Sequence, residues 1–208
     1  PTRGISARGI IGLRLNTSAS ILLNGDYVQI MNGASFQVGQ NGLTYFLKFN
    51  SDFIRLDKTT KSFVNVEIVQ GEKEDQAFTG TGNPLQSYNL TTKDPTDQYL
   101  VEVFVDGKLW KLVDSIYDMN NGEKCAMVKT SVNGGLSVFF GNNQFGEPPA
   151  LGSRIRVTYV KTRGVAGNIG GKQLDIKFID PGTDSSGEQA DLNEILSINI
   201  TRNRSEER

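Results

Sequence analysis

Short segments in which apolar and polar residues alternate recur along the chain, separated by Gly, Asn and Asp. Residues 154–159 show the pattern most clearly, because Ile155, Val157 and Tyr159 alternate with polar side chains. Successive side chains of a strand point to opposite faces, so this segment predicts a strand with those three residues in the core. No segment keeps a period near 3.6 residues over three turns. The pattern therefore predicts an all-β fold of mainly antiparallel sheets with little helix.

Other segments extend this prediction to most of the chain. In Phe63–Val69 the alternation places Val64, Val66 and Ile68 on the core face. The polar stretch Asp180–Asp191 is interpreted as a loop. Further strands are expected at 35–38, 44–49, 174–178 and 195–200.

The clearest local signal is VEVFVDGKLWKLV, in which Asp106-Gly107 separates two alternating segments. Asp-Gly between strands is typical of a two-residue hairpin turn, with Gly107 at a positive φ. Such a turn fixes the register of the two strands, and it places the only Trp beside a valine and a carboxylate beside an ammonium group. The expected cross-strand pairs are Val105 with Lys108, Phe104 with Leu109, Val103 with Trp110, and Glu102 with Lys111.

A second hairpin is expected between MVKTSV and GLSVFF, turning at Asn133-Gly134. Together the segments predict two packed β lobes. A scaffold lobe would contain residues 1–92 and 169–208, and an inserted β-hairpin lobe would contain residues 93–168.

Composition and charge remove several classes of function. The 208 residues include 22 basic and 23 acidic ones, for a net charge of −1, so no electrostatic footprint for nucleic acid is visible. No apolar run approaches the roughly 20 residues that a membrane-spanning helix needs. The absence of His removes most Ser-His-Asp, Cys-His and His-metal chemistry. The single cysteine, Cys125, is expected to be a buried, inert thiol in a strand.

Three patterns resemble ligand-binding loops, but each fits a simpler interpretation. The acidic loops Asp118–Glu123 and Asp180–Glu188 lack the spacing of a calcium loop, and Gly122 falls fifth in its loop instead of sixth. Gly164–Gly171 is rich in glycine but lacks the lysine of a phosphate-binding loop. With 23 acids, close carboxylate pairs arise by chance, so none indicates a glycosidase. No cofactor or metal site is therefore expected.

The two ends of the chain suggest an excised piece. Pro1 stands where an initiator Met is usual, and the final SEER reads as the first turn of a helix. We expect a parent protein that continues on both sides with helical segments.

The stretch from Leu136 to Asn168 resembles the signature region of the baseplate J-like family of contractile-tailed phages. In that family a strand leads into a phenylalanine-glycine turn, and a glycine-rich segment ends in Gly-Asn. The family often has Asp-Gly directly after this turn, where the present chain has Asn142-Asn143. Upstream segments from about Ile21 onward also follow the family's order. The matching positions are Phe140, Gly141, Gly146, Pro148, Pro149, Gly152, Val157, Tyr159, Gly164, Gly167 and Asn168, and the hairpin adds Asp106, Gly107 and Trp110 as motif positions.

This resemblance implies a structural role without catalytic residues. A baseplate wedge component contacts other baseplate proteins, self-associates in a symmetric assembly and rearranges when the tail contracts. The resemblance implies neither an enzyme nor a nucleic-acid, membrane or small-molecule substrate partner. It places the protein in the tail baseplate of the virion after folding in the host bacterial cytoplasm.

Two other functions stay open. A carbohydrate-binding β-sandwich of a phage tail, used for receptor binding, would need exposed aromatic side chains gathered in a groove. Trp110 is instead assigned to a hairpin pair. A glycosidase ranks last, because no carboxylate pair stands in a distinctive setting.

Overall fold

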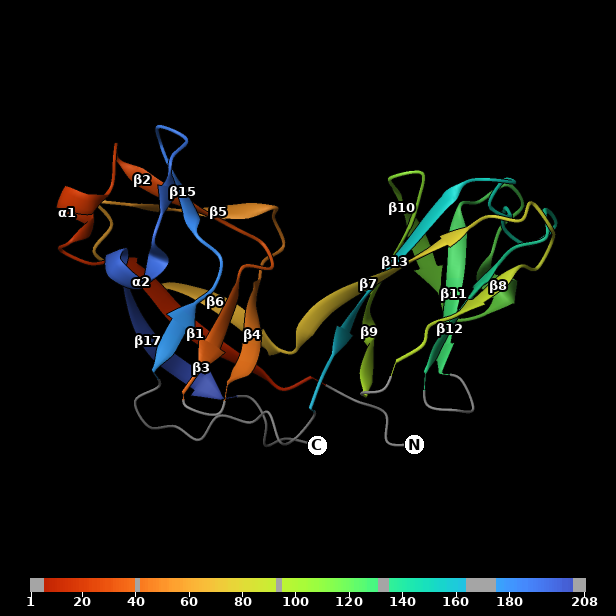
Figure 1. Ribbon diagram of the computed structural model, residues 1–208, viewed down its shortest axis with the longest axis horizontal. Helices are drawn as coiled ribbons and strands as arrows, with labels where there is room; N and C mark the ends of the chain where they lie inside the picture. The colour runs from red at the N-terminus through yellow and green to blue at the C-terminus, as the bar shows by residue number, and fades with distance from the viewer. Residues whose placement is uncertain (1–5, 40–41, 93–94, 131–134, 164–174, 204–208) are drawn as a thin grey trace. The chain divides into compact units, whose positions relative to one another are not determined.

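The computed structural model describes residues 6–39, 42–92, 95–130, 135–163 and 175–203 (Figure 1). The chain is nearly all β, with 53% strand and 6% helix, which confirms the predicted fold class. It divides into two compact units. The inserted unit contains Lys73–Gly164, and the scaffold unit contains Ser6–Glu72 and Val165–Arg208.

The scaffold unit consists of a six-stranded sheet, in the order β14-β3-β4-β6-β1-β17, and a four-stranded sheet, in the order β16-β15-β2-β5. Ile11, Leu13, Ile30 and Leu47 are completely buried in its core. The bounds are β1 Arg8–Leu15, α1 Ala19–Leu22, β2 Tyr27–Met31, β3 Ser35–Val38, β4 Leu43–Lys48, β5 Phe53–Asp57, β6 Val64–Gln70, β14 Ile176–Phe178, β15 Gly182–Asp184, β16 Gln189–Ala190, α2 Leu192–Ile195 and β17 Leu196–Asn203.

The structure corrects the interpretation of Asp180–Asp191 as a loop. This stretch contains β15 and β16, which pair as a short hairpin. The Asp184 carboxylate accepts hydrogen bonds from the backbone N–H groups of Ser186 and Glu188, at 2.9 Å each. Such local bonds fix a turn through polar side chains, and hydrophobic alternation does not reveal them.

The inserted unit is built on a seven-stranded sheet in the order β7-β13-β9-β10-β11-β12-β8. Its core includes Val103, Val138, Ile155 and Val157, all completely buried. The bounds are β7 Glu72–Thr79, β8 Ser87–Asn89, β9 Thr96–Val105, β10 Lys108–Val113, the 3-10 turn η1 Ile116–Asp118, β11 Cys125–Thr130, β12 Leu136–Phe140 and β13 Arg154–Lys161.

Side chains join the two edge strands of this sheet, so that it closes on itself. The rings of Phe78 on β7 and Tyr88 on β8 lie 5.0 Å apart. The Gln76 amide donates to the Thr91 carbonyl at 3.0 Å and accepts from the Thr91 N–H at 3.2 Å. One glutamine thus takes the place of a backbone pair, and closure leaves fewer unpaired edge groups.

The boundary between the units lies earlier in the chain than expected. Residues 73–92 were assigned to the scaffold lobe, but they belong to the inserted unit. The reason is strand pairing, because β7 lies next to β13 and β8 pairs with β12. The second expected boundary, at 168/169, falls in 164–174, outside the described residues.

The hairpin at Asp106-Gly107 has the predicted register over three pairs: Val105 with Lys108, Phe104 with Leu109, and Val103 with Trp110. Both turn residues have positive φ, 50° at Asp106 and 77° at Gly107, as a type I′ turn requires. The predicted Glu102–Lys111 pair is wrong. The ladder between β9 and β10 ends at Trp110. The next residues, Lys111 to Val113, pair in parallel with β11, and the Lys111 ammonium contacts the Glu123 carboxylate at 2.7 Å.

We expect Gly107→Val to lower the stability of the inserted unit by about 1 kcal/mol or more. A β-branched residue resists positive φ, whereas no atom lies within 4 Å of the position of an added Cβ. Thermal melts measure the effect. Gly107→Asn is the control, since asparagine tolerates this conformation. Coinciding melts of Gly107→Val and the parent would show that the turn does not constrain the fold.

The remaining strand predictions agree with the structure. β11 and β12 form the second hairpin, although residues 131–134, with its expected turn, lie outside the described residues. Ile155, Val157 and Tyr159 on β13 are buried as predicted. Val66 and Ile68 on β6 are buried at 4% and 3% exposure, as predicted, whereas Val64 is only partly buried against the same core and Val69, on the opposite face, is completely buried.

Candidate assembly surface

The motif positions between β12 and β13 gather in one region of the inserted unit. We name this region the motif loop cluster and define it as residues 80–86 and 141–153. Phe140 ends β12 and leads into it, with its ring packed edge-on against Trp110 at 5.5 Å between centroids. Both side chains are buried, so the cluster begins from the core of the unit.

Gly141 stands where the chain reverses tightly. A Cβ at this position would lie 2.2 Å from the backbone of Phe145 and Gly146. The Asn142 N–H donates to the Phe145 carbonyl at 3.1 Å, and the Asn143 N–H donates to the Gly146 carbonyl at 2.9 Å. Only glycine fits this approach, which gives a physical reason for the Phe-Gly turn of the motif.

Asn142-Asn143 adopts the conformations that Asp-Gly would favour at the same place. The Asn142 Oδ1 accepts from the N–H groups of Gln144 and Phe145, a role that an aspartate carboxylate can also fill. Asn143 has φ of 73°, in the left-handed region that glycine and asparagine tolerate. The departure from the family's Asp-Gly therefore leaves the turn geometry accessible.

Gly146 ties the cluster to the preceding turn. Its φ is 68°, its N–H donates to the Asn120 carbonyl at 3.1 Å, and a Cβ here would lie about 3 Å from the sulfurs of Met119 and Cys125. Cys125 is completely buried, as expected. Burial raises the pKa of its thiol, which disfavours the reactive thiolate.

The acidic loop Asp118–Glu123 is a turn held by its last residue. The Glu123 carboxylate pairs with Lys111 and accepts from the backbone N–H and side-chain amide of Asn120 at 3.1 and 3.0 Å. Lys111, and then Asn120, hold the pKa of Glu123 at about 2, below its ordinary value of 4.5. The Glu123 carboxylate therefore has a structural role, in which it stabilises the turn.

Acid is expected to remove the stabilisation that the ionised Glu123 carboxylate gives to the inserted unit. Because the folded-state pKa is lowered, Glu123 stabilises the inserted unit above about pH 4.5, and the contribution is lost as pH falls toward 2. Glu123→Gln should unfold at lower urea concentration than the parent at neutral pH, and the difference should shrink on acidification. A difference that stays constant between pH 6 and pH 2.5 would contradict the ion-pair account.

Gln86 joins the two halves of the motif loop cluster. Its buried amide donates to the carbonyls of Pro149 and Asn83 at 2.8 and 3.2 Å. Its Oε1 accepts from the Thr81 N–H at 2.9 Å and from the Tyr88 hydroxyl at 2.7 Å. Nothing in the local pattern around residue 86 marks it in the sequence, so sequence reasoning missed it.

Backbone bonds complete the cluster at Gly152, whose φ is 81°. Its N–H donates to the Gly80 carbonyl, and the Gly80 N–H donates to the Ser153 carbonyl, at 2.9 and 2.8 Å. The structure thus places Gly152 and Pro149 against residues 80–86, which lie about 70 positions earlier in the chain.

Two leucines of the motif loop cluster have side chains exposed to solvent. Leu151 is 81% exposed and Leu85 is 54% exposed. Leu85 also has φ of 56°, a left-handed conformation that a leucine rarely adopts. Backbone strain of this kind concentrates at functional positions and persists only where surrounding bonds hold it. Here the Leu85 N–H donates to the Gly141 carbonyl at 2.9 Å.

The last motif positions lie elsewhere. Tyr159 is buried on β13, where its hydroxyl accepts from Gln76 and donates to Glu74, both at 3.0 Å, so it supports closure of the sheet. Gly164, Gly167 and Asn168 lie outside the described residues. Asp106, Gly107 and Trp110 form the hairpin and are not among the residues of the motif loop cluster.

The exposure of the aromatic side chains bears on the carbohydrate-binding alternative. Trp110 is 5% exposed and belongs to the core of the inserted unit. Tyr99 and Tyr117 are the strongly exposed tyrosines among the described residues, at 69% and 82%. The tryptophan is therefore not available as an exposed stacking surface for a sugar.

The described ranges hold neither a metal site nor a membrane-spanning helix. No three His, Cys, Asp or Glu side chains there are placed to hold a metal ion. The described helices include none with the length and apolarity to cross a membrane. No family model matches the chain, and no curated protein matches it.

Proposed function

We propose that this chain is a structural component of a contractile-tail phage baseplate wedge. It acts through protein–protein contacts in baseplate assembly and in rearrangement during contraction. The observation that carries the proposal is the motif loop cluster, where the residues that resemble the baseplate J-like family fix two solvent-facing leucines.

The physical argument rests on rigidity and exposure. Gln86 and the backbone bonds of Gly152 hold the loops, so that Leu85 and Leu151 lose little conformational entropy when a partner covers them. Apolar side chains at the centre of an interface contribute most when neighbouring polar groups are already satisfied. A stable contact buries on the order of 1,200 Å² in total, so we expect further surface of the chain to take part.

The test is to mix the chain with other baseplate proteins of the same phage and measure co-migration by size exclusion, then affinity by calorimetry. Leu85→Asn separates function from folding. Asparagine tolerates the φ at this position, so the variant should be at least as stable as the parent. Loss of the apolar side chain should nevertheless weaken partner binding by about tenfold, and Leu151→Asn should do the same.

Leu109→Asn is the matched control, since Leu109 is 60% exposed but lies on β10, outside the motif loop cluster. It should leave partner binding unchanged. Equal effects of all three substitutions would refute the assignment of this surface. Specific sugar binding on a glycan array, without binding to any baseplate protein, would favour the carbohydrate-binding alternative.

A further inference from the structure

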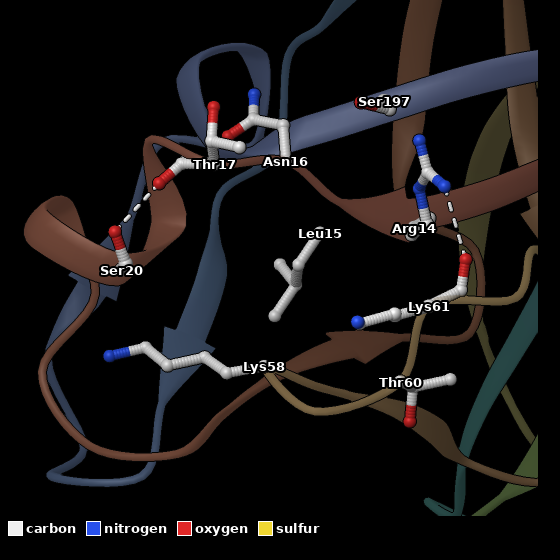
Figure 2. A pocket seen from close by; sticks show the side chains of 9 residues that line it. All are labelled: Arg14, Leu15, Asn16, Thr17, Ser20, Lys58, Thr60, Lys61 and Ser197. Atoms are coloured by element: carbon white, nitrogen blue, oxygen red, sulfur yellow. Dashed lines mark hydrogen bonds between the residues drawn. The ribbon is translucent and has the colours of Figure 1, made fainter.

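A cavity of about 500 Å³ opens in the scaffold unit (Figure 2). It lies where the end of β1, the turn into α1, the β5–β6 connection and the start of β17 come together. None of these segments belongs to the motif loop cluster, so the cavity is independent of the proposed assembly surface. The lining residues are Arg14, Leu15, Asn16, Thr17, Ser20, Lys58, Thr60, Lys61 and Ser197.

The lining is cationic although the chain is not. Arg14, Lys58 and Lys61 contribute three positive charges, and no carboxylate is among the lining residues. The whole chain, in contrast, has 22 basic and 23 acidic residues. Like charges around one cavity raise its potential and favour a ligand of opposite sign.

Two of the cations are held in place without an acidic partner. The Arg14 guanidinium lies over the Phe63 ring at 4.5 Å, and its Nη1 donates to the Lys61 carbonyl at 3.1 Å. The Lys58 ammonium donates to the Leu23 carbonyl at 2.9 Å. An arginine has five N–H donors and a lysine three, so both keep donors for a ligand.

Lys61 is the cation best placed to meet a ligand. Its side chain extends toward the middle of the cavity, next to Leu15 (Figure 2). Its ammonium group has no hydrogen-bond or ion-pair partner within the part of the chain that the structure describes. The hydroxyls of Thr17, Ser20, Thr60 and Ser197 add polar groups around the same space.

The Asn16 side chain fixes the wall of the cavity, because its polar atoms are bonded to the protein and are not directed at a ligand. Its amide donates to the Glu194 carbonyl at 2.8 Å, and its Oδ1 accepts from the Ala19 N–H at 3.2 Å. These bonds join the end of β1 to α2 and to α1. The wall formed by Asn16 and Thr17 is therefore fixed before any ligand arrives, which lowers the entropic cost of binding.

We infer that this cavity binds a small ligand that carries phosphate or carboxylate oxyanions. The planar guanidinium fork of an arginine matches both groups, and an ammonium adds a point charge. The volume is within the range of small-molecule sites, roughly 300–1,000 Å³, and exceeds the space of a single phosphate. The buried Leu15 gives an apolar contact for the body of such a ligand.

The experiment is an NMR titration of the ¹⁵N-labelled chain with pyrophosphate and, separately, with citrate, at low ionic strength. Saturable shifts of residues around the cavity are expected with at least one of the two. The pyrophosphate and citrate arms distinguish phosphate from carboxylate as the preferred group. A neutral sugar of similar size serves as the uncharged reference.

Lys61→Gln should weaken binding by about tenfold or more, since it removes a charge-assisted hydrogen bond from the cavity. Lys61 is exposed and without a side-chain partner, so the fold should survive the change. Lys177→Gln is the matched control: it removes one exposed charge from β14 of the same unit, away from the lining. It should leave the affinity unchanged.

Two results would overturn the inference. Equal weakening by Lys61→Gln and Lys177→Gln would show that only net charge matters. Shifts with a glutamate-rich peptide, but with neither small anion, would assign the cavity to an acidic segment of a protein. The proposed assembly function would stand in either case, because it is tested at Leu85 and Leu151.

Discussion

Gly141→Ala is expected to destabilise the inserted unit by about 3 kcal/mol. The new Cβ would lie 2.2 Å from backbone atoms of Phe145 and Gly146, which cannot move away as a flexible side chain could. The turn would have to open, and the bonds from Asn142 and Asn143 that close it would be lost. Urea denaturation followed by Trp110 fluorescence reports on this unit, because Trp110 is the only Trp and lies in its core.

The control is Gly152→Ala in the same loop. Gly152 has φ of 81°, but no atom lies near the position of its Cβ. The substitution should cost only the left-handed conformation, roughly 1–2 kcal/mol. If both variants shift the urea midpoint equally, the close backbone approach at Gly141 does not hold the turn, and the physical explanation of the Phe-Gly motif fails.

Gln86→Leu should cost about 3 kcal/mol, almost as much as the change at Gly141. Leucine has a similar size, so the core volume is nearly kept. The Pro149 carbonyl and the Thr81 N–H, however, would lose their partner, and a buried polar group without a hydrogen bond is costly. Trp110 fluorescence in urea again measures the effect.

Two further variants sharpen this result. Gln86→Glu keeps the acceptor for Thr81 and Tyr88, but its second carboxylate oxygen would face the carbonyls of Asn83 and Pro149 as a buried, unpaired acceptor, so at neutral pH it should be at least as destabilising as Gln86→Leu. Gln144→Leu changes an exposed glutamine in the same loop cluster and should stay within about 0.5 kcal/mol of the parent. A Gln86→Leu variant as stable as Gln144→Leu would mean that the amide network contributes nothing.

The sequence predicts those parts of the fold that depend on neighbours along the chain. The Asp106-Gly107 turn and the alternating residues beside it determine three cross-strand pairs, because a two-residue turn leaves one register. The core face of β13 follows from period-two alternation alone. The Phe-Gly motif also indicates where the chain turns, although not what surrounds the turn.

Prediction fails where the decisive contact joins distant residues. The Glu102–Lys111 pair was wrong: the ladder with β9 stops at Trp110, and the Lys111 side chain instead contacts Glu123 in the turn before β11. The unit boundary moved because β7 and β8 find their partners in the inserted unit. The hydrophobic pattern identifies a strand and its buried face. It does not identify the neighbouring strand, because many strands could form backbone hydrogen bonds with the same strand edge. The pairing therefore depends on the packing of the whole unit.

The same division holds for the candidate sites. Turn chemistry and alternation are local properties, so the amino-acid sequence alone predicts the all-β fold class, the Asp106-Gly107 hairpin and the turns at the motif glycines. Three features become visible only in the folded chain: Gln86 joins Pro149 to residues 80–86, Leu85 and Leu151 face solvent, and cations from separate segments line one cavity. These features depend on where segments far apart in the chain meet, and that is fixed by burial and hydrogen bonding summed over each unit.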